Sequence, residues 1–149
     1  MTDRKLRFRQ ALARITRVRE QQAAASLAHA AAVVKQCEEA RGQAMDVRNA
    51  VERERGRCLD ADAGLDMARY ALLGTMHEAC EKRVDLATDA WETADAVRLA
   101  CGETHLHARH RWERANEEAA QYRSDLAAQL HQKRMEDGIE LWLQGRERA

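Results

Sequence analysis

The sequence predicts an all-α protein: a long two-helix antiparallel coiled-coil hairpin with a helical overhang at its C-terminus. Its 149 residues include no proline, and about a fifth of them are alanine, a composition that permits very long helices. Aromatic residues make up only 4% of the chain, too few to fill a globular core of this size. Two stretches with apolar residues at helical coiled-coil spacing are separated by one cluster of turn-forming residues. We therefore expect a single elongated domain over residues 1–149.

The first helix is expected over about residues 3–57. From Ala30 a mostly apolar stripe recurs with alternating steps of three and four, the 3.5-residue repeat of a coiled-coil seam. The expected seam comprises Ala30, Val33, Cys37, Ala40, Ala44, Val47, Val51, Glu54 and Cys58. A weaker upstream continuation comprises Leu12, Ile15, Arg19, Gln22 and Ser26. Two consecutive steps of four, from Gln22 to Ala30, predict a stutter that locally relaxes the supercoil.

The turn is expected at about residues 58–64. Gly56 and Gly64 lie on either side of it, and glycine is the residue that most easily ends a helix. Asp60 and Asp62 are candidate caps for the following helix, and Asp66 suits its first turn.

The second helix is expected over about residues 65–146, with a second seam. The seam comprises Leu72, Met76, Cys80, Arg83, Ala87, Ala90, Ala94, Val97, Cys101, Thr104 and Ala108. After another pair of four-residue steps it continues through Trp112, Ala115, Ala119, Tyr122, Leu126 and Leu130. A three-helix bundle with Gly102 as a second turn is the main alternative. The repeat passes through Gly102 in phase, which favours the hairpin.

The C-terminal part of the second helix has no expected partner within the chain. Pairing outward from the turn, the first helix covers only about 55 residues of the second, which leaves about 30 residues from near Gln121 uncovered. This segment still carries apolar side chains such as Ile139, Leu141 and Trp142. It is therefore a candidate binding surface, with folding back of the helix as the alternative.

Charge is balanced overall but not along the chain. Lysine plus arginine and aspartate plus glutamate are equal at 25 each, which argues against nucleic-acid binding. Residues 1–20 have a net charge of +5, which fits an acidic partner surface or, alternatively, a solvated helix end. No secretory signal and no long apolar run is present, so we expect a cytoplasmic protein without stable membrane insertion.

The stretch CGETHLHARHR, residues 101–111, contains several side chains that bind metals in other proteins. The pairs Cys101–His105, Glu103–His107 and His107–His110 are three or four residues apart, so each pair shares a helical face, but the pairs do not all lie on one face. We therefore expect no metal, no cofactor and no catalytic residue, and a protein that is not an enzyme. The three histidines are interpreted as flanking and outer positions of the helix. Cys37 and Cys80 are expected to face each other, as buried thiols or as a disulfide.

Two apolar features are candidate contact sites. Among the tryptophans, Trp91 and Trp142 are candidate partner anchors, whereas Trp112 is expected in the seam. The run LDMARYALLGTM after the turn is more apolar than a solvated tip requires. It is a candidate docking patch, with self-packing of the tip as the alternative.

These features resemble the FliJ and YscO family of type III secretion central-stalk proteins, including its Hrp-type members. The similarity covers most of the chain and is strongest in AGLDMARYALLGTMHEACEKRVDLATDAW, residues 63–91. There, as in the family, an Ala-Gly-hydrophobic start leads to a tyrosine followed by a hydrophobic step and a later tryptophan. Gly74 departs from the family pattern just after that tyrosine.

The resemblance implies a stalk shaped like the rotor shaft of the rotary ATP synthase, linking a hexameric export ATPase to the export gate of a type III secretion or flagellar export apparatus. Secretion chaperones are further implied partners, and the implied location is the cytoplasmic face of the apparatus. A coiled-coil adaptor or secretion chaperone without an ATPase role is the alternative. The expected ATPase-ring contacts are Arg4, Lys5, Arg7, Arg9, Arg14, Leu141 and Trp142. The expected export-gate contacts at the tip are Leu65, Tyr70, Leu73, Met76 and His77.

Overall fold

The computed structural model describes residues 2–60 and 64–147, and the side chains of 4–60 and 64–146. These residues form two long helices, α1 (Thr2–Arg57) and α2 (Met67–Glu147), and no strand occurs among them. α2 is one continuous helix through Gly102, which excludes the three-helix alternative. A Cβ at Gly102 would lie 4.0 Å from Cδ1 of Leu27, so the glycine faces α1.

Local hydrogen bonds define where the helices end. The backbone N–H of Cys58 donates to the carbonyls of Glu54 and Arg55, which closes the last turn of α1. α2 begins two residues later than expected because Asp66 is its cap: its carboxylate accepts from the N–H of Arg69 at 3.0 Å. Gly64 has φ of 80°, a left-handed conformation that other residues rarely adopt. The proposed cap Asp62 lies outside the described residues.

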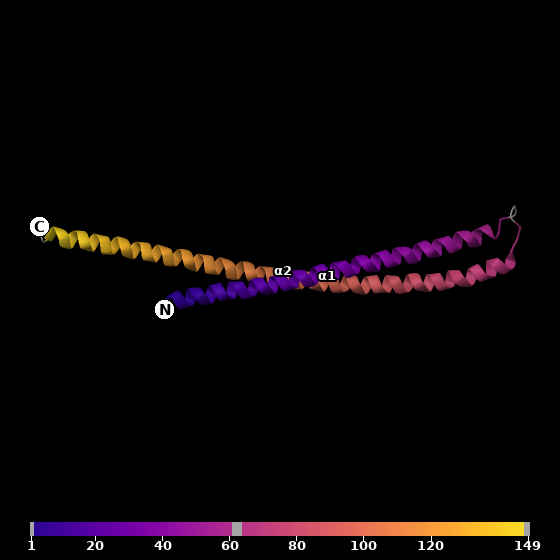
Figure 1. The fold of residues 1–149 in the computed structure, drawn as a ribbon, viewed down its shortest axis with the longest axis horizontal. Helices are drawn as coiled ribbons and strands as arrows, with labels where there is room; N and C mark the ends of the chain where they lie inside the picture. Colours follow the sequence, from indigo (N-terminus) through magenta and orange to yellow (C-terminus); the bar gives the residue numbers. More distant parts are fainter. Residues whose placement is uncertain (1, 61–63, 148–149) are drawn as a thin grey trace. The chain divides into compact units, whose positions relative to one another are not determined.

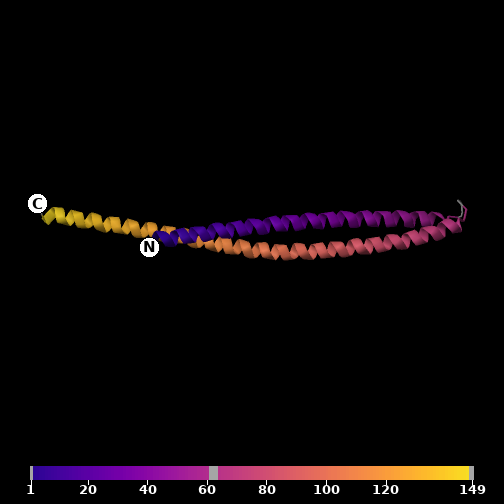
Figure 2. The same cartoon turned by 60° about the horizontal axis from the view of Figure 1, so that its bottom comes forward.

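The chain divides into two compact units. The terminal unit comprises Met1–Ala23 and His105–Ala149, and the turn unit comprises Ala24–Thr104. Each unit contains one segment of α1 and one of α2, which lie side by side in a hairpin arrangement (Figures 1 and 2).

The contacts in the turn unit pair the two helices in opposite chain order. The guanidinium of Arg41 lies 4.6 Å from the ring centroid of Trp91. Further along α1, a carboxylate oxygen of Glu52 lies 3.8 Å from Nε2 of His77. At the turn, Arg55 lies 4.5 Å from the ring centroid of Tyr70.

The terminal unit shows the same order. Arg9 lies over the ring of Tyr122 and Arg17 over the ring of Trp112, with 4.8 and 4.2 Å to the ring centroids. Glu20, further along α1, reaches back to His105 near the start of this part of α2. The direction of the pairing is therefore the same within each unit.

Small side chains fill the interior. The buried residues among those described are Ala30, Val51, Cys58, Cys80 and Ala94 in the turn unit, and Ala115 and Ala119 in the terminal unit. No large side chain among the described residues is fully buried. Because little apolar volume lies between the helices, each long side chain that is buried across the interface contributes a large share of the stability.

The inward stripe of α1 differs from the expected seam. The prediction is correct at Ala30, Val33, Cys37, Ala44, Val51, Glu54 and Cys58, which are buried or half-buried. It is wrong by one residue at two positions: Ala40 and Val47 are exposed, whereas Arg41 and Arg48 are half-buried. The upstream continuation is wrong in the same direction. Leu12, Ile15, Arg19, Gln22 and Ser26 are exposed, and the half-buried residues are Ala13, Thr16, Glu20, Ala23 and Leu27.

The inward stripe of α2 shows the same displacement. The expected positions that are exposed are Leu72, Met76, Arg83, Ala90, Val97, Thr104 and Leu130. The half-buried residues that replace the first six of them are Leu73, His77, Val84, Trp91, Arg98 and His105. The expected seam is correct at Cys80, Ala87, Ala94, Cys101, Ala108 and from Trp112 to Leu126.

With these positions, no stutter is needed in either helix. Half-buried or buried residues follow alternating steps of three and four from Leu6 to Cys58 and from Tyr70 to Leu126. Arginine occupies inward positions because its methylene stem covers apolar surface while its guanidinium stacks on an aromatic ring, as Arg41 and Arg55 do.

Candidate functional site

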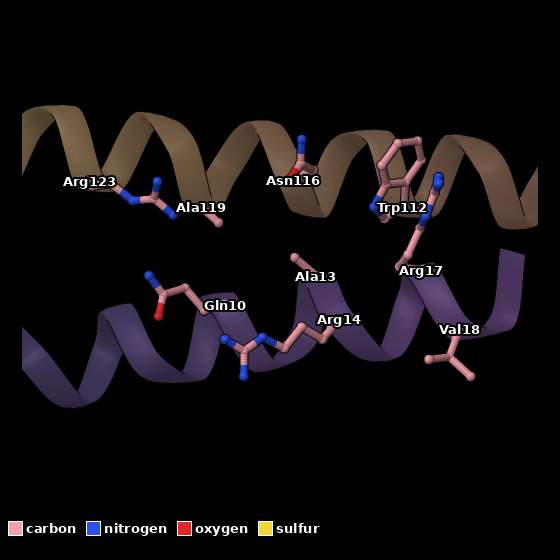
Figure 3. A pocket seen from close by; sticks show the side chains of 9 residues that line it. All are labelled: Gln10, Ala13, Arg14, Arg17, Val18, Trp112, Asn116, Ala119 and Arg123. Carbon is pink, nitrogen blue, oxygen red and sulfur yellow. The ribbon is translucent and has the colours of Figure 1, made fainter. Parts of the chain in front are cut away.

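A groove of about 470 Å³ in the terminal unit brings together several cationic side chains; we call it the arginine groove. Its lining residues are Gln10, Ala13, Arg14, Arg17, Val18, Trp112, Asn116, Ala119 and Arg123 (Figure 3). The α1 residues and the α2 residues each recur mainly at steps of three and four, so each set occupies one helical face. Ala119 is buried between them, and its small side chain gives the groove depth.

Arg17 is fixed at one end of the groove. Its guanidinium lies over Trp112, and its Nη1 lies 3.4 Å from a carboxylate oxygen of Glu20. The other oxygen of that carboxylate lies 3.1 Å from Nε2 of His105, so Glu20 joins Arg17 to α2. These three side chains, with Trp112, form a connected network of charged and aromatic groups.

Arg14 and Arg123 lie at the other end with Gln10, from opposite walls of the groove (Figure 3). Both arginines are exposed, and no carboxylate of the described residues forms an ion pair with either. No acidic residue lines the groove. It is therefore a positively charged recess in a chain whose total charge is zero.

The histidine stretch has two different roles in the structure. The interpretation of His105 as a flanking residue is wrong, because it is a half-buried inward residue bonded to Glu20. His107 and His110 are exposed, as expected. In the residues that the structure describes, no three histidine, cysteine or acidic side chains form a group that could hold a metal.

Arg109 and Glu113 form an exposed pair one helical turn apart, with Nε and Oε1 2.8 Å apart. The hydrogen bond from Arg109 is the largest effect and holds the pKa of Glu113 below its ordinary value. Desolvation opposes this shift, and the positive charge of Arg109 adds a smaller lowering effect. The same hydrogen bond raises the pKa of Arg109. The pair stabilises α2 locally and lies outside the groove lining.

Three of the five expected ATPase-ring residues of α1, Arg4, Lys5 and Arg9, line a second groove of about 540 Å³ in the terminal unit. Its lining residues are Arg4, Lys5, Phe8, Arg9, Leu12 and Glu118. Arg14 lines the arginine groove instead, and Arg7 is exposed outside both linings. Arg9 is half-buried, lies over Tyr122 and donates to the carbonyl of Glu118 at 3.3 Å. Phe8 is 67% exposed and was missed by the sequence analysis. The signal was available, because Phe8 is the only phenylalanine of the chain and stands among basic residues.

The C-terminal part of α2 exposes all its side chains from residue 127 to residue 146. Both views show this part of α2 continuing past the start of α1 (Figures 1 and 2). Leu141 and Trp142, two expected contacts, are 70% and 61% exposed. Leu130, Met135 and Ile139 add further exposed apolar surface.

The expected tip contacts are divided between exposed and inward positions. Leu65 and Met76 are exposed, whereas Tyr70, Leu73 and His77 are half-buried. The guanidinium of Arg55 occupies the space beside Gly74: Nη2 of Arg55 would lie 3.6 Å from a Cβ added there. Gly74 thus lies beside the arginine that stacks on Tyr70.

Trp91 does not have the exposed position of a partner anchor. It is half-buried in the turn unit and covered by Arg41. Cys37 and Cys80 do not meet. The contacts Arg41–Trp91 and Glu52–His77 place Cys37 near Ala94, with which it lines an apolar groove of about 880 Å³. All four cysteines are free thiols.

No protein-family model, curated protein or solved structure matches the chain. No described helix contains an apolar stretch long enough to cross a membrane.

Proposed function

We propose that this chain is a non-enzymatic central stalk of a type III secretion or flagellar export apparatus, which inserts its terminal unit into a hexameric export ATPase and links that ATPase to the export gate. In this proposal the chain is an antiparallel coiled-coil hairpin with a C-terminal overhang. The observation that carries the proposal is the composition of the terminal unit. There, exposed basic side chains of α1 accompany a C-terminal stretch of α2 that is exposed throughout.

The terminal unit has the two kinds of surface that insertion into a protein ring requires. Arg4, Lys5 and Arg14 are exposed and suit an acidic ring surface. Leu141 and Trp142 are exposed apolar anchors, and tryptophan is enriched among residues that dominate binding energy. A shaft that contacts the subunits of a ring unequally biases them toward different states, which links ATP hydrolysis to the orientation of the shaft.

The proposal is tested by adding the purified chain to the cognate export ATPase and measuring hexamer formation and the rate of ATP hydrolysis. We expect at least one of the two to rise. The double variant L141A/W142A should lose most of this effect without loss of thermal stability, because both side chains are exposed.

Two matched control variants separate specific contacts from general effects. L86A/L99A removes two exposed leucines of the turn unit, which are 69% and 55% exposed, and should retain the stimulation. Charge reversal of Arg4, Lys5 and Arg14 should weaken the stimulation. Reversal of the exposed Lys35, Arg53 and Arg83 of the turn unit should weaken it much less. Absence of any effect of the wild-type chain on a verified partner ATPase would contradict the proposal.

The tip of the hairpin is the proposed contact with the export gate. Leu65 and Met76 are the expected tip residues whose side chains are exposed for such a contact. Substitution of these two by serine should weaken binding to the gate protein and leave ATPase stimulation unchanged. Recovery of secreted substrates or their chaperones in pull-downs, without the ATPase, would favour an adaptor function instead.

A further inference from the structure

The arginine groove has the chemistry of a binding site for side-chain carboxylates. We propose that it binds an acidic segment of a protein partner, with two carboxylates on neighbouring turns of a helix. Arg14 and Arg123 would bind one carboxylate between them, and Arg17 would bind the other. This proposal states the chemistry of the partner surface that the terminal unit would bind. It rests on the proposed function only for the identity of that partner.

The first argument is the geometry of the donors. Arg14 and Arg123 extend from opposite helices toward the same end of the groove, where the amide of Gln10 also lies (Figure 3). A guanidinium presents its N–H groups as a planar fork that matches the two oxygens of a carboxylate. Two guanidinium groups and an amide from two walls therefore surround the site of a carboxylate.

The second argument is the preorganisation of Arg17. Stacking on Trp112 and the ion pair with Glu20 already hold its guanidinium at the other end of the groove. A ligand that binds an ordered side chain loses less conformational entropy than one that must order it. Trp112 is half-buried, and its ring adds apolar surface against which the methylene groups of a glutamate can pack.

The third argument is charge. Three arginines line the groove and no acidic residue does. Arg17 is paired with Glu20 outside the lining, so the uncompensated positive charge comes from Arg14 and Arg123. Residues three and four apart on a helix lie about 5–6 Å from each other, so carboxylates on neighbouring turns can reach the two ends of one groove.

The surroundings favour a protein ligand over a nucleic acid. A nucleic acid follows a continuous basic track, and its affinity comes mainly from phosphate contacts along that track. Next to the arginine groove, α2 instead forms a recess lined by Glu117 and Glu118 together with Ala120, Gln121 and Ser124. These carboxylates repel a polyphosphate but accept basic side chains that alternate with acidic ones in a protein segment.

The test measures binding of a fluorescein-labelled peptide with glutamate at every fourth position in an alanine and glutamine background. A peptide with glutamine in place of each glutamate is the matched ligand control. We expect the acidic peptide to bind the full chain and the glutamine peptide to bind at least about tenfold more weakly, since hydrogen bonds between charged groups are stronger than those between neutral groups.

The protein variant is R14Q/R123Q, and its control is K133Q/R134Q. Both pairs are exposed and lose the same charge, but the control pair lies in the stretch of α2 that is exposed throughout. The groove variant should weaken peptide binding about tenfold or more. R14K/R123K should lose part of the affinity, because lysine keeps the charge without the planar fork. Circular dichroism should show wild-type helix content for all three variants.

Three outcomes would overturn the proposal. Equal weakening by the control variant would show a response to net charge alone. Equal binding of the glutamine peptide would show that carboxylates are not recognised. Displacement of the acidic peptide by single-stranded RNA at lower concentration than by free acidic peptide would assign the groove to polyphosphates. The assay contains no ATPase, so the groove and the stalk proposal can fail separately.

Discussion

The carboxylate of Glu20 lies 3.1 Å from Nε2 of His105, across the interface between the two helices of the terminal unit. Both side chains occupy inward positions of the heptad repeat, where a coiled coil usually places apolar residues. The pair is 14% and 20% exposed, and Glu20 also pairs with Arg17. A polar group enclosed in this way depends on its partner, because neither side chain is fully solvated.

Replacement of this pair should show strong coupling between the two positions. E20L should destabilise the chain by about 1–2 kcal/mol, because His105 is left facing a leucine without its hydrogen bond. H105L should destabilise the chain less than E20L does, since Arg17 still pairs with Glu20. The double variant E20L/H105L should be as stable as wild type or more stable, because two apolar side chains suit both positions. Thermal unfolding of the four proteins checks this, and simple addition of the two single effects would contradict it.

Gly74→Ala should stabilise the chain by up to about 1 kcal/mol, the difference in helix propensity between the two residues. Gly74 lies inside α2, and the added Cβ would make ordinary van der Waals contact with Arg55, at 3.6 Å from Nη2. Gly138→Ala, in the exposed part of α2 with open space around its Cβ, is the control for propensity alone. A lower melting temperature for G74A than for wild type would show that Arg55 needs the space beside the glycine.

Trp91 and Trp142 should differ sharply when replaced by alanine. W91A should cost about 2–3 kcal/mol, because it removes a half-buried ring and the surface on which Arg41 stacks. W142A should leave thermal stability nearly unchanged, since that side chain is 61% exposed. W91F should destabilise the chain less than W91A does, because phenylalanine keeps an aromatic ring and the buried indole N–H of Trp91 has no acceptor among the described residues. Similar melting temperatures for W91A and W142A would contradict the inward position of Trp91.

An oxidation experiment tests the register of the turn unit. Cys37 and Cys80 should not form a disulfide, because the contacts place them about 13 residues apart along the helix axis, roughly 20 Å. In the variant A94C, oxidation should link Cys37 to the new cysteine, since Cys37 and Ala94 line the same groove. Peptide mapping by mass spectrometry identifies the linked pair. A Cys37–Cys80 disulfide within one chain would show a different register.

Glu113 should titrate below the ordinary value of a glutamate, about 4.3. The hydrogen bond from Arg109 lowers its pKa, so the charged form is favoured in the folded chain. The stabilisation is present above the unfolded-state pKa and is lost as the pH falls through the lower folded-state pKa. NMR titration of the Glu113 side-chain carboxyl should show the low value, and R109Q should raise it. An unchanged titration in R109Q would assign the shift to another group.

Much of the fold could be predicted from the sequence because its signals are local. The absence of proline, the abundance of alanine and the single cluster of turn residues define two long helices and one connection, α1 ending at Arg57 and α2 starting at Met67. The arginine groove was not predicted, because Arg123 and Asn116 have no distinguishing signal until α2 places them beside Arg14.

The 3.5-residue repeat and many of its inward positions, such as Ala30, Ala44 and Ala94, could be read from the sequence alone, because mostly small residues recur there. Between successive positions of this kind, the sequence allows either of two adjacent residues to face inward. Hydrophobicity alone favoured Ala40 and Val47 over Arg41 and Arg48. In the structure Arg41 and Arg48 are the residues that face inward. Each long stem covers the alanine interior, and in Arg41 the guanidinium stacks on an aromatic ring of the other helix. That choice depends on a partner ring about 50 residues away, which no local pattern specifies.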